Sequence, residues 1–241
     1  MIYKKKILAL VPARAGSKGL KNKNYKLLNG IPLFAHSLKT LKKSKYIDRI
    51  VLSTDSEKII KMSKKYGNFI YYKRPKKISS DKSSTLQVLK HALKFFSNKD
   101  DYYDYIFCLE PTSPFTTSDD VDKVIEEVAK NKAYDSAVSI SYLEKYHPNF
   151  IFKINKKKTI SAYEEGEKYN YRRQNISKLY FLDGSLYFSQ VKNLHKNKGF
   201  IGKKTYGYIM PKWKSLEIDD HIDFELAKNT FKNIKRFKDE K

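Results

Sequence analysis

Residues 6–24, KILALVPARAGSKGLKNKN, decide the fold of this chain. The apolar run from Ile7 to Val11 predicts a buried β-strand, and the polarity changes abruptly after it. Residues 12–19 hold two glycines, a serine and two cations, Arg14 and Lys18. A strand that ends in such a loop is typical of the phosphate-binding edge of an α/β sheet.

The loop itself has the composition of a phosphate site. Gly16 and Gly19 allow positive φ angles and close backbone approach. Backbone N–H groups in such a loop can cradle phosphate, and cationic side chains can neutralise its charge. Lys23 and Asn24 add a further cation and an amide. The pattern is neither GxxxxGK[ST] nor GxGxxG, so an ordinary strand-to-helix turn with solvated lysines remains an alternative.

The rest of the chain alternates short apolar runs with segments of helical periodicity. The predicted strands are Ile7–Val11, Arg49–Thr54, Phe69–Tyr72, Tyr105–Leu109, Ser136–Ile140, Phe150–Ile154, Leu179–Phe188 and Tyr206–Met210. The predicted helices are Leu33–Ser44, Ser56 to about Tyr66, Ser83–Ser97, Ser118–Lys132 and residues 221–237. This alternation predicts an α/β fold with a mostly parallel sheet and helices on both faces.

Ligands of such sheets lie beyond the carboxyl ends of the strands. Four strand ends are candidates: residues 14–18, 53–55, 110–114 and 141 onward. The first and third have the most unusual composition, so we expect these two loops to line the site.

Three sequence motifs follow one another in the order of a known family. They are PARAGSKGLKNKN at residues 12–24, LEPTSP at residues 109–114 and EIDDHIDF at residues 217–224. Together they resemble the CMP-sialic acid synthetases, or acylneuraminate cytidylyltransferases, a family that includes CMP-legionaminic and CMP-pseudaminic acid synthetases. The resemblance covers nearly the whole chain and implies a Rossmann-like, nucleotide-diphospho-sugar transferase-like fold.

The resemblance also implies a reaction. The family joins CTP to a nine-carbon 2-keto sugar acid of the sialic, legionaminic or pseudaminic type, giving a CMP-sugar and pyrophosphate. Its glycine-rich loop binds the CTP triphosphate, and the residues at the matching positions here are Ala13, Arg14, Gly16, Ser17, Lys18, Lys23 and Asn24. Arg14, Lys18 and Lys23 would stabilise charge on the triphosphate and on the leaving pyrophosphate.

A second cluster, Lys73-Arg74-Pro75 and the residues up to Thr85, resembles the family segment that recognises cytosine and ribose. The resemblance implies that Arg74 donates to the pyrimidine and that Ser84 and Thr85 satisfy its remaining edge. The structural alternative is a helix N-cap at Ser83 or Ser84. The two roles are compatible.

Glu110 stands where the family usually has a glutamine that contacts the sugar. A carboxylate only accepts hydrogen bonds, whereas an amide also donates them, so the sugar contact is expected to differ. The alternative for the Pro-Thr-Ser-Pro sequence is a rigid turn that ends the strand.

Glu217 and Asp219 match two family carboxylates that hold a divalent cation. On an extended segment the spacing i, i+2 directs both side chains to one side. Carboxylates together with a triphosphate suit Mg²⁺ (or Mn²⁺). Glu217 replaces an aspartate of the family pattern, which leaves Asp219 as the firmer ligand and as a candidate catalytic residue. The alternative is N-capping of the following helix by Asp219 or Asp220.

Residues 142–190 are rich in aromatic residues and lysine and lack helical periodicity, which predicts a protrusion of extended structure. The resemblance implies a homodimer in which this protrusion completes the partner's site. Arg173 is the candidate that binds the sugar carboxylate, and a surface ion pair with a nearby glutamate is the alternative. Phe181 and Asp183 depart from the family pattern, which has arginine and asparagine there.

Length, charge and hydropathy limit the other classes. The 241 residues fit a single domain, 1–241, and no apolar run is long enough for a transmembrane helix, so we expect a cytoplasmic protein without a membrane partner. The lone cysteine, Cys108, is expected to be a buried thiol. The net charge of +24 comes from lysines scattered along the chain, which favours a solvated surface over nucleic-acid binding.

Two alternatives for the function stay open. One is a related nucleotidyltransferase acting on another sugar acid, such as the eight-carbon Kdo. The other is a non-catalytic protein that binds nucleotides or nucleic acid, which the net charge of +24 suggests.

Overall fold

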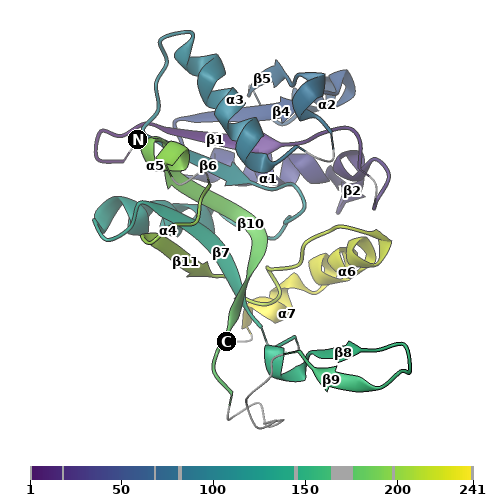
Figure 1. The fold of residues 1–241 in the computed structure, drawn as a ribbon. Helices are drawn as coiled ribbons and strands as arrows, with labels where there is room; N and C mark the ends of the chain where they lie inside the picture. The colour runs from purple at the N-terminus through teal and green to yellow at the C-terminus, as the bar shows by residue number, and fades with distance from the viewer. Residues whose placement is uncertain are drawn as a thin grey trace.

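A computed structural model describes residues 2–17, 19–67, 69–80, 83–143, 146–163, 176–196 and 199–239. A seven-stranded sheet with helices on both faces forms its body (Figure 1). The strands of this sheet, in spatial order, are β11 (Thr205–Ile209), β7 (Ser136–Tyr142), β10 (Tyr180–Gln190), β6 (Tyr105–Leu109), β1 (Ile7–Pro12), β4 (Arg49–Thr54) and β5 (Ile70–Lys73).

Every neighbouring pair in this sheet is parallel except those that include β10. β10 runs antiparallel between β6 and β7, where Phe188 lies opposite Phe107 on one side and Ala137 on the other. The parallel strands therefore all end at one edge of the sheet, and the predicted mostly parallel α/β fold is confirmed. Two short ladders, β2 (Leu27–Leu28) with β3 (Ile31–Pro32) and β8 (Phe152–Ile154) with β9 (Ile160–Ala162), stand apart from it.

The helices follow one another in chain order, and the last two pack in a cluster that contains no residue of the seven-stranded sheet. They are α1 (Leu33–Lys43), α2 (Glu57–Ser63), α3 (Thr85–Ser97), α4 (Ser118–Lys130), α5 (Val191–Lys196), α6 (His221–Lys232) and α7 (Ile234–Asp239). Single turns of 3₁₀ helix occur at η1 (Lys23–Tyr25), η2 (Lys76–Ile78) and η3 (Pro148–Phe150). The predicted terminal helix is interrupted at Asn233, and α5 was not predicted because six residues carry too little periodicity.

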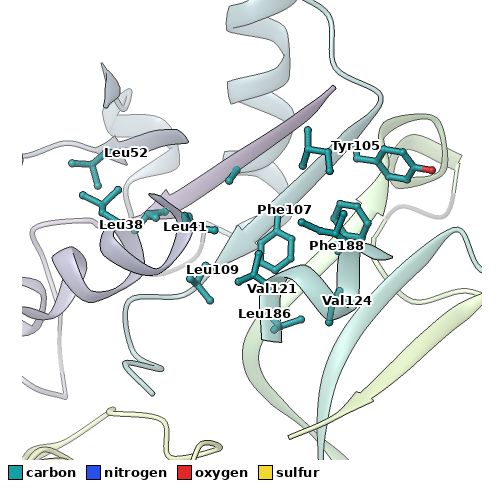
Figure 2. Packing of buried hydrophobic residues seen from close by; sticks show 14 of the residues in the cluster. Leu38, Leu41, Leu52, Tyr105, Phe107, Leu109, Val121, Val124, Leu186 and Phe188 are labelled. Carbon is teal, nitrogen blue, oxygen red and sulfur yellow. The ribbon is translucent and has the colours of Figure 1, made fainter. Parts of the chain in front are cut away.

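Alternate side chains of the central strands enter two cores. Tyr105, Phe107 and Leu109 of β6 pack with α1 and α4 on one face, as Figure 2 shows for this cluster. Ile106 and Cys108 pack on the other face with α3 and α5, and Cys108 is buried as expected. Strands that are buried on both faces read as continuous apolar runs, which explains why the sequence predicted them so well.

The predicted protrusion is smaller than residues 142–190. Leu186–Gln190 pair with β6, so this part of β10 belongs to the central sheet. The far ends of β7 and β10 and the β8–β9 hairpin extend away from the body (Figure 1). No helix in the described ranges is long and apolar enough to cross a membrane.

Candidate active site

A cavity of about 550 Å³ opens at the edge where the parallel strands end. Most of the predicted site residues line it together: Arg14, Ser17, Lys23, Asn24, Arg74, Thr85, Glu110, Glu217 and Asp219. The loops after β1 and β6 both contribute, as expected from their composition. The loop at residues 53–55 does not line the cavity but holds the loop after β1, since Asp55 Oδ1 accepts a hydrogen bond from the Ala15 N–H at 2.8 Å.

Three predicted residues do not line the cavity. Ala13 is buried, and its N–H donates to the Ser53 carbonyl at 2.9 Å. Gly16 is not among the lining residues, and its φ lies outside the left-handed region, so the loop does not use the positive φ that a glycine allows there. Ser84 is the N-cap of α3: its Oγ accepts from the Gln87 N–H, and the Gln87 side chain accepts from the Ser84 N–H. Lys18 and Arg173 lie outside the described residues.

The loop after β1 is held by its own side chains. Asn24 is buried and donates from Nδ2 to the Arg14 carbonyl at 2.8 Å. Ser17 Oγ accepts from the Lys23 N–H at 3.1 Å and donates to the Leu20 carbonyl. These bonds use local side chains to fix a non-repetitive backbone, so Asn24 positions the loop, and Arg14 reaches the cavity from it.

Lys23 ties this loop to the acidic segment before α6. Its Nζ lies 2.8 Å from the Ile218 carbonyl and 3.0 Å from Asp219 Oδ1. The Lys23 side chain is 14 % exposed and that of Asp219 is 70 % exposed, so the cation is fixed and the carboxylate faces solvent. Cation and carboxylate therefore meet in the cavity from segments almost 200 residues apart in the chain.

Gly19 permits the same contact between the two segments. A Cβ at this position would lie 2.5 Å from the Asp219 carbonyl oxygen, closer than packing allows, whereas at Gly16 no described atom lies within 4 Å. We expect Gly19→Ala to push the loop away from Asp219 and to weaken CTP binding about tenfold in a calorimetric titration, which corresponds to about 1.4 kcal/mol. Gly16→Ala is the matched control and should bind CTP within about twofold of the unmodified chain. Equal effects of the two substitutions would contradict this expectation.

Arg74 forms the cavity wall next to the end of β4. It is buried, with Nε 3.0 Å from Ser53 Oγ and Nη2 2.9 Å from the Ser53 carbonyl. A planar guanidinium held at two points presents its remaining face in a fixed direction. Thr85, the first residue of α3, lines the same cavity, so two of the three residues predicted to recognise the base meet there.

Glu110 lies half-buried at the end of β6. Its Oε1 accepts a hydrogen bond from Thr85 Oγ1 at 3.2 Å, with Cys108 Sγ at 3.8 Å. Burial raises the pKa of Glu110 to about 7, and the charge of Glu217 raises it further against the hydrogen bond from Thr85. At neutral pH this carboxyl therefore carries a proton for much of the time and can donate as well as accept, as an amide does.

The raised pKa predicts how stability depends on pH. The folded chain holds the Glu110 proton more tightly than the unfolded chain, so stability falls as pH rises from about 4.5 to about 7. Glu110→Gln removes this loss, because the amide does not titrate. We expect the variant to gain about 1–3 kcal/mol over the unmodified chain at pH 8, and almost nothing at pH 4.5, in thermal unfolding without ligands. A difference between the two proteins that stays constant with pH would show that folding does not raise the pKa of Glu110.

The acidic pair stands on the extended segment before α6. Glu217 Oε1 accepts from Thr112 Oγ1 at 3.3 Å, and the Ile218 N–H donates to the Thr112 carbonyl at 2.9 Å. Burial and the nearby negative charge of Asp219 both raise the pKa of Glu217. The helix cap is a different residue, Asp220, whose Oδ1 accepts from the Ile222 and Asp223 N–H groups.

This donor set fits a divalent cation that is completed by other ligands. The part of the chain that the structure describes contains no cluster of three or more His, Cys, Asp or Glu side chains that could hold a metal by itself. Glu217 and Asp219 line the same cavity, and two carboxylates suit Mg²⁺. This cation usually binds one or two carboxylates and takes phosphate oxygens and water as its other ligands.

β10 supplies residues that sequence reasoning missed. Gly184 has a φ of +71°, and a Cβ there would lie 3.0 Å from Glu217 Oε2, so the position requires glycine beside the carboxylate. Tyr187 lines the cavity from the same strand. Gly184 falls within the predicted strand Leu179–Phe188, and a glycine inside a strand often marks a place where another group approaches the backbone closely. Asp183 is buried and accepts from Ser141 Oγ at 2.9 Å and the Ser185 N–H at 3.0 Å, which suits a carboxylate.

An α/β sheet with cations after its first strand and carboxylates facing them in one cavity has the charges that nucleotidyl transfer requires. The chain belongs to the cytidylyltransferase family, since the family model described as Cytidylyltransferase matches residues 8–239. Several curated relatives align with more than nine-tenths of the chain. An N-acylneuraminate cytidylyltransferase of Escherichia coli O18:K1:H7 is 33% identical over 92% of this chain, which spans about half (51%) of that relative's length.

Other relatives align over nearly their whole length. A CMP-N,N'-diacetyllegionaminic acid synthase of Legionella pneumophila is 30% identical, over 92% of this chain and 94% of its own. A pseudaminic acid cytidylyltransferase of Campylobacter jejuni is 28% identical over 94% and 97%. Among solved structures, a CMP:2-keto-3-deoxy-manno-octonic acid synthetase complexed with CTP has a TM-score of 0.65 at 14% identity, covering 95% of this chain and 99% of its own. That structure shares the fold.

Proposed function

We propose that the protein joins CTP to a nine-carbon 2-keto sugar acid of the sialic, legionaminic or pseudaminic type. The C2 hydroxyl would attack the α-phosphorus in line, forming the new P–O bond as the bond to pyrophosphate breaks. The observation that carries the proposal is the single cavity in which the loop cations, Arg74 and the two carboxylates face one another. Relatives that align along almost the whole chain are named for this reaction with three different sugar acids.

The phosphate end of the cavity supports the role of the cations. Arg14 and Lys23 from the β1 loop, with Lys18, would bind the triphosphate and stabilise the charge that builds up on the departing pyrophosphate. Ser17 and Asn24 would keep the loop backbone in place through the hydrogen bonds described above. Phosphoryl transfer requires mainly positioning and charge stabilisation, and fixed cations provide both.

Base and sugar would occupy the remaining walls. Arg74, held against Ser53, would donate to the cytosine beside Thr85 and the α3 N-terminus at Ser84. Glu110 would contact the sugar, and its partly protonated carboxyl can replace both functions of an amide. Arg173 is our candidate for the sugar carboxylate.

Glu217 and Asp219 would hold Mg²⁺ (or Mn²⁺). The cation supplies Lewis-acid polarisation of the α-phosphate when bound. The chain's own part is to hold the carboxylates at the cavity: Thr112 fixes Glu217, and Lys23 keeps the exposed Asp219 beside it. The positive charge of Lys23 also compensates the negative charge of Asp219 before substrates bind.

We also propose a single domain, 1–241, that works as a homodimer in the cytoplasm. The part of the protrusion that the structure describes exposes large apolar side chains, which supports an interface with a second copy. They include Tyr142, Tyr146, Ile154, Ile160, Tyr163, Tyr180, Phe181 and Leu182. Phe181, which occupies a position where the family pattern has arginine, would then face the partner.

The test is pyrophosphate release from CTP and Mg²⁺ with a panel of nine-carbon acids plus Kdo, each with and without EDTA. We expect release with one nine-carbon acid, no release with ATP or UTP, and no release in EDTA. Release with Kdo alone would replace the proposed substrate class while keeping the reaction. Absence of release with every acid, together with intact CTP binding, would overturn the proposed reaction.

A further inference from the structure

A second charged cavity lies at the opposite edge of the sheet. It has a volume of about 740 Å³, larger than the 550 Å³ of the candidate active site. It opens where β7 and β11 begin and β10 ends, on the side of Figure 1 that carries α5 and the end of α4. The active-site residues belong to the other ends of these parallel strands, so the two cavities are separate sites.

Five lysines line this second cavity, here called the lysine cavity: Lys132, Lys192, Lys196, Lys203 and Lys204. All five are exposed, and none of them is within ion-pair distance of a carboxylate in the described chain. Asp135 supplies the one carboxylate among the described lining residues, and Ser136 Oγ already donates to it at 3.2 Å. The described lining thus carries five cationic side chains against one carboxylate, a local excess of positive charge.

The backbone under these lysines is well fixed. Lys203 and Lys204 stand on a turn in which Thr205 Oγ1 accepts from the Gly202 N–H at 2.7 Å and donates to the Phe200 carbonyl at 3.1 Å. The Lys204 carbonyl accepts from the Asp135 N–H at 3.0 Å, which joins this turn to the start of β7. The cations are therefore carried by a preformed scaffold.

Helix α5 and the turn after α4 complete the rim. Lys192 and Lys196 are four residues apart on α5 and so share one face of the helix. Lys132 stands on a turn closed by the Tyr134 N–H, which donates to the Asn131 carbonyl at 3.0 Å. Like charges gathered around one cavity repel each other, and a multivalent anion is the ligand that relieves this repulsion.

We infer that the lysine cavity is a second binding site, for the phosphate chain of a soluble polyphosphate anion. Lysine ammonium groups bind phosphate as point charges, and several of them around one cavity suit two or more linked phosphates better than a single one. The volume is that of a small-ligand site, and the lysines surround a hollow instead of covering a flat face, which favours a small anion over a membrane surface. The site does not depend on the proposed sugar chemistry.

The experiment titrates ¹⁵N-labelled protein with sodium tripolyphosphate in 50 mM NaCl and follows the Gly202 and Thr205 amides, which report on the lysine cavity alone. The expected result is a saturable shift with a sub-millimolar Kd. The combined variant Lys192→Gln, Lys196→Gln, Lys203→Gln and Lys204→Gln should bind at least tenfold more weakly. Its nucleotidyl transfer should be unchanged, since these residues lie outside the active site.

The matched control removes the same charge elsewhere, through Lys43→Gln, Lys61→Gln, Lys64→Gln and Lys65→Gln on α1, α2 and the turn after α2. It should bind within about twofold of the unmodified chain. Equal weakening in both variants, or no shift of the two amides up to 10 mM tripolyphosphate, would overturn the inference. Retention on phosphatidylserine vesicles without tripolyphosphate binding would also overturn it and would assign these lysines to a membrane surface. Single variants Lys196→Gln and Lys204→Gln keep the test open if the combined variant does not fold.

Discussion

Replacing Asp219 with alanine is expected to lower the rate of CMP-sugar formation by about 10³-fold or more. Asp219 and Glu217 are the two carboxylates of the cavity between β10 and the loop after β1 that suit a divalent cation. Glu217 is held by Thr112, so the exposed Asp219 is the carboxylate that can turn toward a cation bound to phosphate. Loss of several kcal/mol of charge stabilisation at the α-phosphate corresponds to a rate loss of this size.

The measurement is pyrophosphate release under saturating CTP over a range of Mg²⁺ concentrations. Glu225→Ala is the matched control, because Glu225 is an exposed carboxylate on α6 that pairs with Lys228 at 2.7 Å. The control should keep full activity. Folding should also be preserved in Asp219→Ala, since the helix cap is Asp220 and not Asp219. An Asp219→Ala enzyme with more than a tenth of the normal rate at all Mg²⁺ concentrations would exclude this residue as a metal ligand.

Replacing Lys23 with alanine is expected to reduce kcat/KM for CTP by about 10²–10³-fold. The Lys23 ammonium is held by the Ile218 carbonyl at 2.8 Å and by Asp219 at 3.0 Å, so it already lies in the cavity at a defined place. Charge stabilisation by a preorganised group needs no rearrangement during the reaction, which is why its loss is costly. Lys23→Ala also leaves Asp219 without its compensating cation.

Lys21→Ala provides the control for this substitution. Lys21 is exposed, belongs to the same loop and does not line the cavity, so its removal changes the net charge equally. We expect kcat/KM of the control to fall less than about threefold at physiological salt. If the two variants lose activity equally, general attraction of CTP to a basic protein would explain the effect, and the position of Lys23 would carry no special role.

The central strands, the position of the cavity and the α3 cap could be predicted from local features of the sequence. Buried strands such as Tyr105–Leu109 are continuous apolar runs, so periodicity alone located them. The residues after Ile7–Pro12 and Tyr105–Leu109 predicted the cavity, because parallel strands carry their following loops to one edge. Ser84 was recognised as a possible cap for the same local reason, since a cap involves only the residues of its own first turn.

Contacts between distant segments had to come from the folded chain. Nothing within residues 180–190 indicates that β10 runs antiparallel between β6 and β7, because strand pairing depends on partners far along the sequence. The same holds for the contact of Gly19 with the Asp219 carbonyl and for the place of Gly184 beside Glu217. The raised pKa of Glu110 likewise comes from burial that a sequence does not display.

The sequence by itself therefore determined the secondary structure of the central strands, the fold class and the residue types that meet at the cavity. It did so because apolar periodicity, caps and loop composition act over a few residues. Only the tertiary structure decided which cation faces which carboxylate, which carboxyl holds its proton near neutral pH, and that five lysines from three separate segments surround one hollow. Electrostatic interactions depend on the distance between charges and on their burial, and both are set only when the strands have assembled into the sheet.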